Sequence, residues 1–107
     1  MYKFKKDKYR KARGNYSRLL NVSCRKCNNL VAVYQKDGAG NLRRLYLDRI
    51  FSSNINKNIK ILKCNKCKEI LGTFYIYPKE NRKAFRLYQD AVIKKIRKIK
   101  NGKKKLL

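Results

Sequence analysis

The residues best suited to chemistry are the four cysteines, which occur in two matched pairs. Each pair has the spacing Cys-x-x-Cys, as "CRKC" in the first half of the chain and "CNKC" in the second. A Cys-x-x-Cys turn brings two sulfur atoms together, and two such turns can supply the four tetrahedral ligands of a structural zinc ion. The spacing therefore predicts a zinc site. Its ligands would be Cys24, Cys27, Cys64 and Cys67.

Basic residues surround both cysteine pairs and favour the ionised thiolate that binds a metal. They are Arg25, Lys26, Lys63, Lys66 and Lys68. A turn of this kind needs a positive φ at the residue after its second cysteine, which we expect at Asn28 and Lys68. A redox dithiol, disulfides and an iron–sulfur cluster are the alternatives for these thiols. The redox alternative lacks the βαβ surroundings that are typical of it.

Outside the cysteines, no side chains form a pattern typical of an active site. The chain has no histidine, and its acidic residues form no evident acid–base pair. They are Asp7, Asp37, Asp48, Glu69, Glu80 and Asp90. Neither a phosphate-binding loop nor a nucleophile motif occurs. Because four thiolates would saturate the metal, no coordination position would stay open for a substrate. We therefore expect no enzyme activity, no catalytic residues and no small-molecule substrate.

The net charge is the second informative feature. The 107 residues include 31 Lys and Arg but 6 Asp and Glu, which gives a formal charge of +25. Such repulsion weakens a compact state unless a polyanion neutralises it. Nucleic-acid backbones attract basic side chains, and here these are spread along the whole chain, so we expect RNA as the partner. The candidate contacts are Lys3, Lys5, Lys6, Arg10, Lys11, Arg13, Arg18, Arg25, Lys26, Arg43, Arg44, Arg49, Lys66, Lys103, Lys104 and Lys105.

The elements that must position these residues fall into three regions: 1–20, 21–77 and 78–107. Residues 1–20 are predicted to form an extended basic arm that becomes ordered on a partner, because no apolar period in them lasts long enough for a helix or strand. Tyr9 and Tyr16 in this arm could stack on unpaired bases. The alternative is a solvated tail without a binding role.

Residues 21–77 are predicted to be the folded centre. Residues 30–35 and 42–50 have strand-like composition, and Gly38 and Gly40 between them favour a hairpin turn. Residues 52–58 form a loop in this interpretation. A further strand covers 70–77, where Pro78 ends the sheet. The arginines of the hairpin could instead belong to a solvated strand face.

The last region, 78–107, is predicted to hold an amphipathic helix from Glu80 to about Lys100, followed by a basic tail. Apolar residues recur there at spacings of three and four, namely Phe85, Tyr88, Val92, Ile96 and Ile99. Asn101 and Gly102 would end the helix. Its apolar stripe would suit an anionic membrane surface, but it suits the sheet equally well. No apolar run reaches the roughly 18 residues of a membrane span, so we expect no membrane partner.

The order of knuckle, β-hairpin, knuckle and strand resembles the zinc ribbon superfamily. The resemblance covers roughly Val22 to Tyr77 and is carried by "CRKC" and "CNKC". It implies an α+β domain stapled by zinc, with antiparallel hairpins between the two knuckles, to which the C-terminal helix and the basic arm are added. A short zinc ribbon with long basic extensions is most similar to small zinc-containing ribosomal proteins.

Charge and resemblance together predict a structural RNA-binding protein of a ribosomal subunit, or one associated with it, that neutralises and packs rRNA. Neighbouring ribosomal proteins would be further partners. The alternative is a zinc ribbon that binds DNA or associates with RNA polymerase in transcription. We expect the protein in the cytoplasm on the ribosome, or in an equivalent reducing compartment of an organelle, where paired thiols serve metals more often than disulfides.

Overall fold

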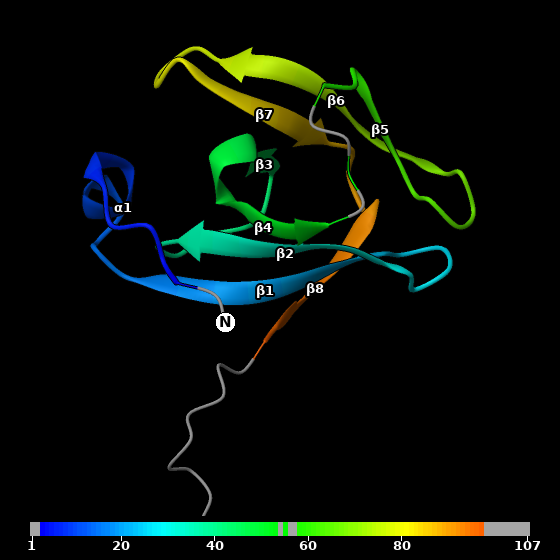
Figure 1. The fold of residues 1–107 in the computed structure, drawn as a ribbon, viewed down its shortest axis with the longest axis horizontal. Coiled ribbons are helices and arrows are strands. Elements are labelled where there is room, and N and C mark those ends of the chain that lie inside the picture. Colours follow the sequence, from blue (N-terminus) through cyan, green and yellow to red (C-terminus); the bar gives the residue numbers. More distant parts are fainter. Residues whose placement is uncertain (1–2, 54, 56–57, 98–107) are drawn as a thin grey trace, which may run out of the picture.

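The computed structural model describes residues 3–53, 55 and 58–97, which form two four-stranded antiparallel sheets (Figure 1). The elements are α1 (Lys8–Ala12), β1 (Ser17–Cys24), β2 (Leu30–Asp37), β3 (Arg44–Tyr46), a 3-10 turn (Leu47–Arg49), β4 (Ile50–Ser53), β5 (Ile61–Lys63), β6 (Ile70–Tyr77), β7 (Arg82–Leu87) and β8 (Val92–Ile96). The strand order is β4-β2-β1-β8 in the first sheet and β3-β7-β6-β5 in the second. Each sheet thus combines strands from both halves of the chain.

The hydrophobic core lies between the two sheets. Val22 and Tyr34 enter it from the first sheet, and Leu45, Leu71 and Phe85 enter it from the second. Each buried side chain of this size contributes about 1.5–3 kcal/mol relative to leaving it in water. Side chains of the first sheet are also buried on its other face, so that face is not simply solvated. Of the predicted α+β class, the part that is confirmed is a small β-rich domain that carries a four-cysteine cluster.

The strands predicted at 30–35 and 70–77 are present as β2 and β6, but the predicted pairing of 30–35 with 42–50 is wrong. β2 pairs with β1 and β4, whereas β3 pairs with β7 in the other sheet. Gly38 has φ 72°, and a Cβ placed on it would lie 2.4 Å from the carbonyl oxygen of Arg13. The glycine turn therefore transfers the chain from one sheet to the other instead of closing a hairpin.

The predicted C-terminal helix is also wrong. Residues 82–87 form β7 between β3 and β6, and residues 92–96 form β8 on the edge of β1. Of the supposed apolar stripe, Phe85 is fully buried, but Tyr88 and Ile96 are 48% and 61% exposed. Asp90 between the strands has φ 60°, which an α-helix does not contain. The sheet hydrogen bonds available from β1, β3 and β6 override the helical spacing.

Residues beyond Arg97, which include Lys100, Asn101 and Gly102 of the predicted helix end, lie outside the described residues. Within the described part of the chain, no helix has the length and apolar character needed to cross a membrane.

Much of the described part of the expected extended arm forms a helix and a strand, whereas residues 3–6 have neither. Asp7 begins α1 as its N-cap, where its carboxylate accepts the backbone N–H groups of Tyr9 at 3.1 Å and Arg10 at 3.2 Å. Residues 17–20 belong to β1, which is paired on both sides. In Figure 1, α1 lies at the end of the molecule opposite the β1–β2 and β5–β6 turns. The helix therefore covers the end of the sheets far from the cysteines.

Candidate metal centre and basic surface

The four cysteines meet where the β1–β2 and β5–β6 turns approach each other. All four Sγ atoms lie within 4.8 Å of one another. The Sγ atoms of Cys24 and Cys67 are 3.6 Å apart, and those of Cys27 and Cys64 are 3.5 Å apart. A tetrahedral ion with metal–sulfur bonds of about 2.3 Å would place its sulfurs about 3.8 Å apart. The shortest distances join one pair to the other, so a single ion could be held by all four thiols.

The two Cys-x-x-Cys turns have the same backbone structure. The Cys24 carbonyl accepts the Asn28 N–H at 2.8 Å, and the Cys64 carbonyl accepts the Lys68 N–H at 3.0 Å. Asn28 has φ 65° and Lys68 has φ 67°. The prediction of a positive φ after each second cysteine is thus confirmed. A positive φ costs less free energy for asparagine than for lysine. The second turn therefore depends more than the first on the contacts around it.

The strands before each turn are irregular at equivalent places. The register of β1 with β2 shifts between Val22 and Ser23, and that of β5 with β6 shifts between Leu62 and Lys63. Both shifts occur directly before the first cysteine of a pair. A shift of this kind bends the strand and increases its twist, which turns the cysteines of both hairpins toward the same point.

Hydrogen bonds and burial set the proton affinity of the cluster. Burial raises the pKa of the Cys64 thiol, but the N–H groups of Cys67 and Lys66 donate to its sulfur and bring that pKa down to about 6. The Glu69 N–H lowers the pKa of Cys67, but burial and the other three thiols raise it to about 11. The Cys64 thiolate therefore forms near neutral pH, whereas the Cys67 thiol retains its proton until a metal displaces it.

A second buried cluster lies at the opposite end of the core, around Arg49. This side chain is 1% exposed, and its Nε donates to Asp37 at 2.9 Å while its two terminal nitrogens donate to Asp7 at 2.6 and 3.0 Å. Asp37 also accepts hydrogen bonds from Ser17 and Gln35, each at 2.7 Å. Arg49 was predicted to contact RNA, and this prediction is wrong because its guanidinium is fully engaged inside the protein.

Arg82 forms a related cluster that the sequence did not reveal. It is 5% exposed and donates to Asp48 at 2.7 Å and to Glu80 at 3.0 Å. Its guanidinium stacks 3.6 Å from the centre of the Tyr46 ring. Arg13, another predicted RNA contact, pairs with Glu80 at 3.0 Å and lies over the same ring. The contacts of Arg13 fix the N-terminal segment to the second sheet.

The other predicted RNA contacts divide into four groups. Arg10 binds Ser17 and Asn15 through its side chain, and Lys26 pairs with Glu69 at 3.5 Å on the exposed surface. Basic side chains exposed around the surface are those of Lys3, Lys5, Lys6, Lys11, Arg18 and Lys66. Three further residues, Arg25, Arg43 and Arg44, line a common cavity. Lys103, Lys104 and Lys105 lie outside the described residues.

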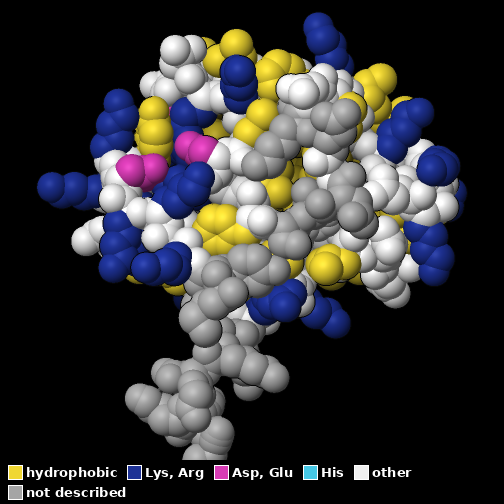
Figure 2. Space-filling model, in the orientation of Figure 1, with side chains coloured by type: hydrophobic (Ala, Val, Ile, Leu, Met, Phe, Trp, Pro, Cys, Tyr) yellow, Lys and Arg dark blue, Asp and Glu magenta, His cyan; other side chains and the backbone are white. Residues whose placement is uncertain are grey.

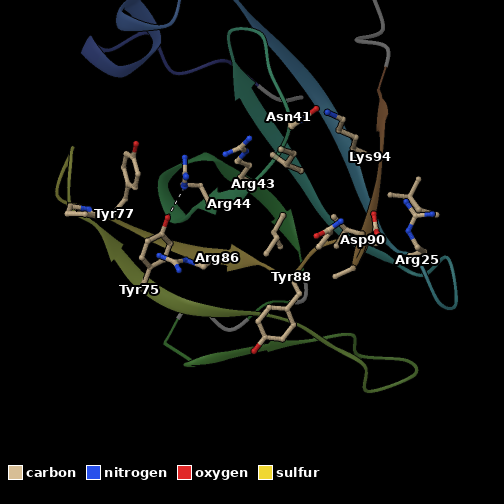
Figure 3. Close-up of a pocket in the computed structure, with 17 residues that line it drawn as sticks. Arg25, Asn41, Arg43, Arg44, Tyr75, Tyr77, Arg86, Tyr88, Asp90 and Lys94 are labelled. Atoms are coloured by element: carbon tan, nitrogen blue, oxygen red, sulfur yellow. Dashed lines mark hydrogen bonds between the residues drawn. The ribbon is translucent and has the colours of Figure 1, made fainter.

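This cavity, which we call the basic cavity, has a volume of about 1020 Å³ and opens on the outer side of the second sheet. Its walls come from residues 41–44, the outer face of β6 and β7, the β7–β8 turn and the start of β8, with Arg25 from the first cysteine turn. Figure 3 shows Arg44 and Arg86 beside Tyr75 on one side, and Arg25 and Lys94 on the other. The sequence did not predict it, because its walls come from segments that are far apart in the chain.

The chain was compared with protein-family models, with curated proteins and with solved structures, and none of them matches. The four-cysteine cluster is compatible with a zinc ribbon, but no family is identified for this chain.

Proposed function

We propose that the protein is a zinc-stabilised RNA-binding protein of the zinc ribbon type. Its place would be in a ribosomal subunit or in close association with one, where it neutralises the phosphates of packed rRNA helices. The role is architectural, and the metal serves the fold instead of a reaction. The observation that carries this proposal is where the protein places its few negative charges.

Four of the six acidic residues form ion pairs with two buried arginines. Asp7 and Asp37 bind Arg49, while Asp48 and Glu80 bind Arg82. The basic side chains elsewhere therefore have few carboxylates nearby. In Figure 2, the acidic side chains visible on this face lie together beside basic ones, whereas Lys and Arg side chains are spread around the outline. A surface that is basic on many sides fits a protein surrounded by polyanion better than one with a single docking stripe.

Zinc is the metal that we propose for the four-cysteine cluster. Four thiolates in a closed tetrahedron are the typical donor set of structural zinc. Two of the thiols are fully buried, and the sulfurs lie at nearly the separations that such an ion requires. The ion would hold together two hairpins that belong to different sheets. It would do so at the end of the molecule opposite the ion-paired clusters of Arg49 and Arg82.

Binding of the zinc-loaded protein to RNA tests the proposal directly. We would measure its affinity for a folded rRNA fragment and for duplex DNA of similar length at several salt concentrations. RNA binding should weaken steeply with salt, because phosphate contacts release counterions. In the variant K3Q/K5Q/K6Q, which removes three exposed charges, the slope of log affinity against log salt should fall by about 2. Equal or stronger binding to DNA would overturn the choice of RNA.

A cellular measurement tests the ribosomal part of the proposal. On a sucrose gradient of lysate, the protein should sediment with one ribosomal subunit and remain there after a high-salt wash. Protein found only at the top of the gradient, or lost from the subunit at modest salt, would contradict an integral ribosomal place.

A further inference from the structure

The basic cavity carries more positive charge than its surroundings can balance. Its cationic side chains belong to Arg25, Arg43, Arg44, Arg86 and Lys94. Asp90 is the one carboxylate among its lining residues. Among the residues that the structure describes, none of these five cations has an ion pair with a carboxylate. The cavity therefore has spare capacity for an anion.

Two of these arginines lie in an arrangement that is unfavourable without an anion. Arg44 of β3 and Arg86 of β7 are direct cross-strand partners. Like charges at opposed positions of an antiparallel pair destabilise a sheet. Tyrosine rings relieve only part of this, because a ring attracts a cation but does not neutralise it. A phosphate group between the two guanidiniums would neutralise the repulsion.

Tyr75 and Tyr77 fix the orientation of the two arginines. The guanidinium of Arg44 lies 4.2 Å from the centre of the Tyr77 ring and donates from Nε to the Tyr75 hydroxyl at 2.8 Å. The guanidinium of Arg86 lies 4.5 Å from the Tyr75 ring centre. Figure 3 shows these side chains side by side, with the hydrogen bond drawn. The cavity thus presents flat aromatic and guanidinium surfaces together with unneutralised charge, and both are arranged before any ligand binds.

We propose that the basic cavity binds a single-stranded segment of RNA. Its phosphates would contact the arginines, and its unpaired bases would stack on the tyrosine rings or on the guanidinium planes. Flat surfaces can be used only by bases whose faces are exposed, and in duplex RNA those faces are covered by stacking. This inference rests on the proposed function, because it names the part of the RNA that one site on the protein recognises.

The size of the cavity supports a segment of RNA over a single phosphate ion. A volume of about 1020 Å³ is at the upper end of the range for sites that enclose a drug-sized ligand. Its cations are distributed over both sides, from Arg44 and Arg86 on the second sheet to Arg25 beside the cysteine cluster. Successive phosphates of a chain could reach both groups, which one inorganic phosphate cannot do.

Matched charge variants provide the test. The cavity variant R43Q/R44Q/R86Q and the control variant K3Q/K5Q/K6Q each lose three positive charges. For both, we would first confirm full metal content and a cooperative melt, and then measure affinity for a single-stranded oligouridine and for a duplex RNA of equal nucleotide number. The cavity variant should lose on the order of tenfold more single-strand affinity than the control. Both variants should lose similar duplex affinity, because there they remove equal charge.

Tyr77→Leu removes a stacking ring without removing charge, and Arg44 keeps its hydrogen bond to the Tyr75 hydroxyl. The variant should weaken oligouridine binding on the order of tenfold while leaving duplex affinity unchanged. In the unmodified protein, a 4-thiouridine oligonucleotide should cross-link under ultraviolet light to peptides that contain residues 75–88. Uridine monophosphate in excess should not displace the oligonucleotide. Equal losses in the two charge variants, cross-links elsewhere or displacement by the mononucleotide would overturn this inference while RNA binding stands. If the unmodified protein binds neither RNA, the proposed function itself fails.

Discussion

Replacing Arg49 by methionine should destabilise the protein strongly, although no ligand site is touched. Methionine keeps most of the side-chain volume but removes the charge that balances Asp37, whose side chain is 4% exposed. Removing one member of a buried ion pair costs about 3–5 kcal/mol. Here the lower value applies, because Asp37 keeps its hydrogen bonds from Ser17 and Gln35. For a domain of this size, a loss of about 3 kcal/mol lowers Tm by about 12–24 °C.

Calorimetry of the metal-loaded protein at neutral pH measures this effect, and Lys26→Met is the matched control. Lys26 also pairs with a carboxylate, that of Glu69, but the two side chains are 66% and 49% exposed. Such a surface pair contributes less than about 1 kcal/mol. Adding Asp37→Asn to Arg49→Met should recover part of the lost stability, because it removes the unbalanced charge. If Arg49→Met melted within about 3 °C of Lys26→Met, the buried cluster would not hold this end of the core together.

Three further outcomes are expected. A strong chelator at neutral pH, or Cys24→Ser, should remove the metal and the cooperative melt together, since structural zinc contributes roughly 10 kcal/mol to folding; a Cys24→Ser protein that keeps one equivalent of metal would show a wrong ligand set. The hydrogen bond from its arginine partner lowers the pKa of Asp7 to about 2 from 3.8, so stability present above pH 4 should be lost as the pH falls toward 2. Solvent screening limits that loss to about 1 kcal/mol, and urea titrations of Asp7→Asn should show a correspondingly smaller acid dependence. Gly38→Ala should cost about 1–3 kcal/mol in urea denaturation, because the new Cβ would collide with the backbone oxygen of Arg13. Gly40→Ala also has a positive φ, of 106°, but open space around the new Cβ, so it isolates the backbone strain and should cost less; a Gly38→Ala cost no larger than that of Gly40→Ala would contradict the collision.

Local signals in the sequence were sufficient for the cysteine cluster. The Cys-x-x-Cys spacing determines the turn over a few residues, so the positive φ at Asn28 and Lys68 could be predicted without knowing the rest of the fold. The strand at 70–77 was equally local, with β-branched and aromatic residues bounded by a proline. The convergence of the two pairs was predicted from the assumption that they share one metal ion.

Sheet membership could not be predicted, because it depends on contacts between distant residues. Phe85 and Val92 recur at a spacing that suits a helix, yet they lie on strands in different sheets. The basic cavity was missed for the same reason, since Arg44 and Arg86 become neighbours only when β3 crosses to the second sheet. The role of Arg49 was missed because its burial depends on ion pairs with Asp7 and Asp37, which are distant in the sequence. Without knowledge of these pairs, a buried arginine cannot be told from an exposed one.

The position of β8 has a consequence for synthesis of the chain. The last of the four clustered cysteines is Cys67, but the edge of β1 is covered only when residues 92–96 pair with it, from Cys24 opposite Val92 to Leu20 opposite Ile96. During translation, the thiols are therefore all available well before the first sheet is complete. In that interval β1 exposes an unpaired edge, which is a template for association with other chains. We expect nascent chains that stop before β8 to hold metal and yet aggregate, so that completion of the last strand, and not metal capture, determines the yield of usable protein.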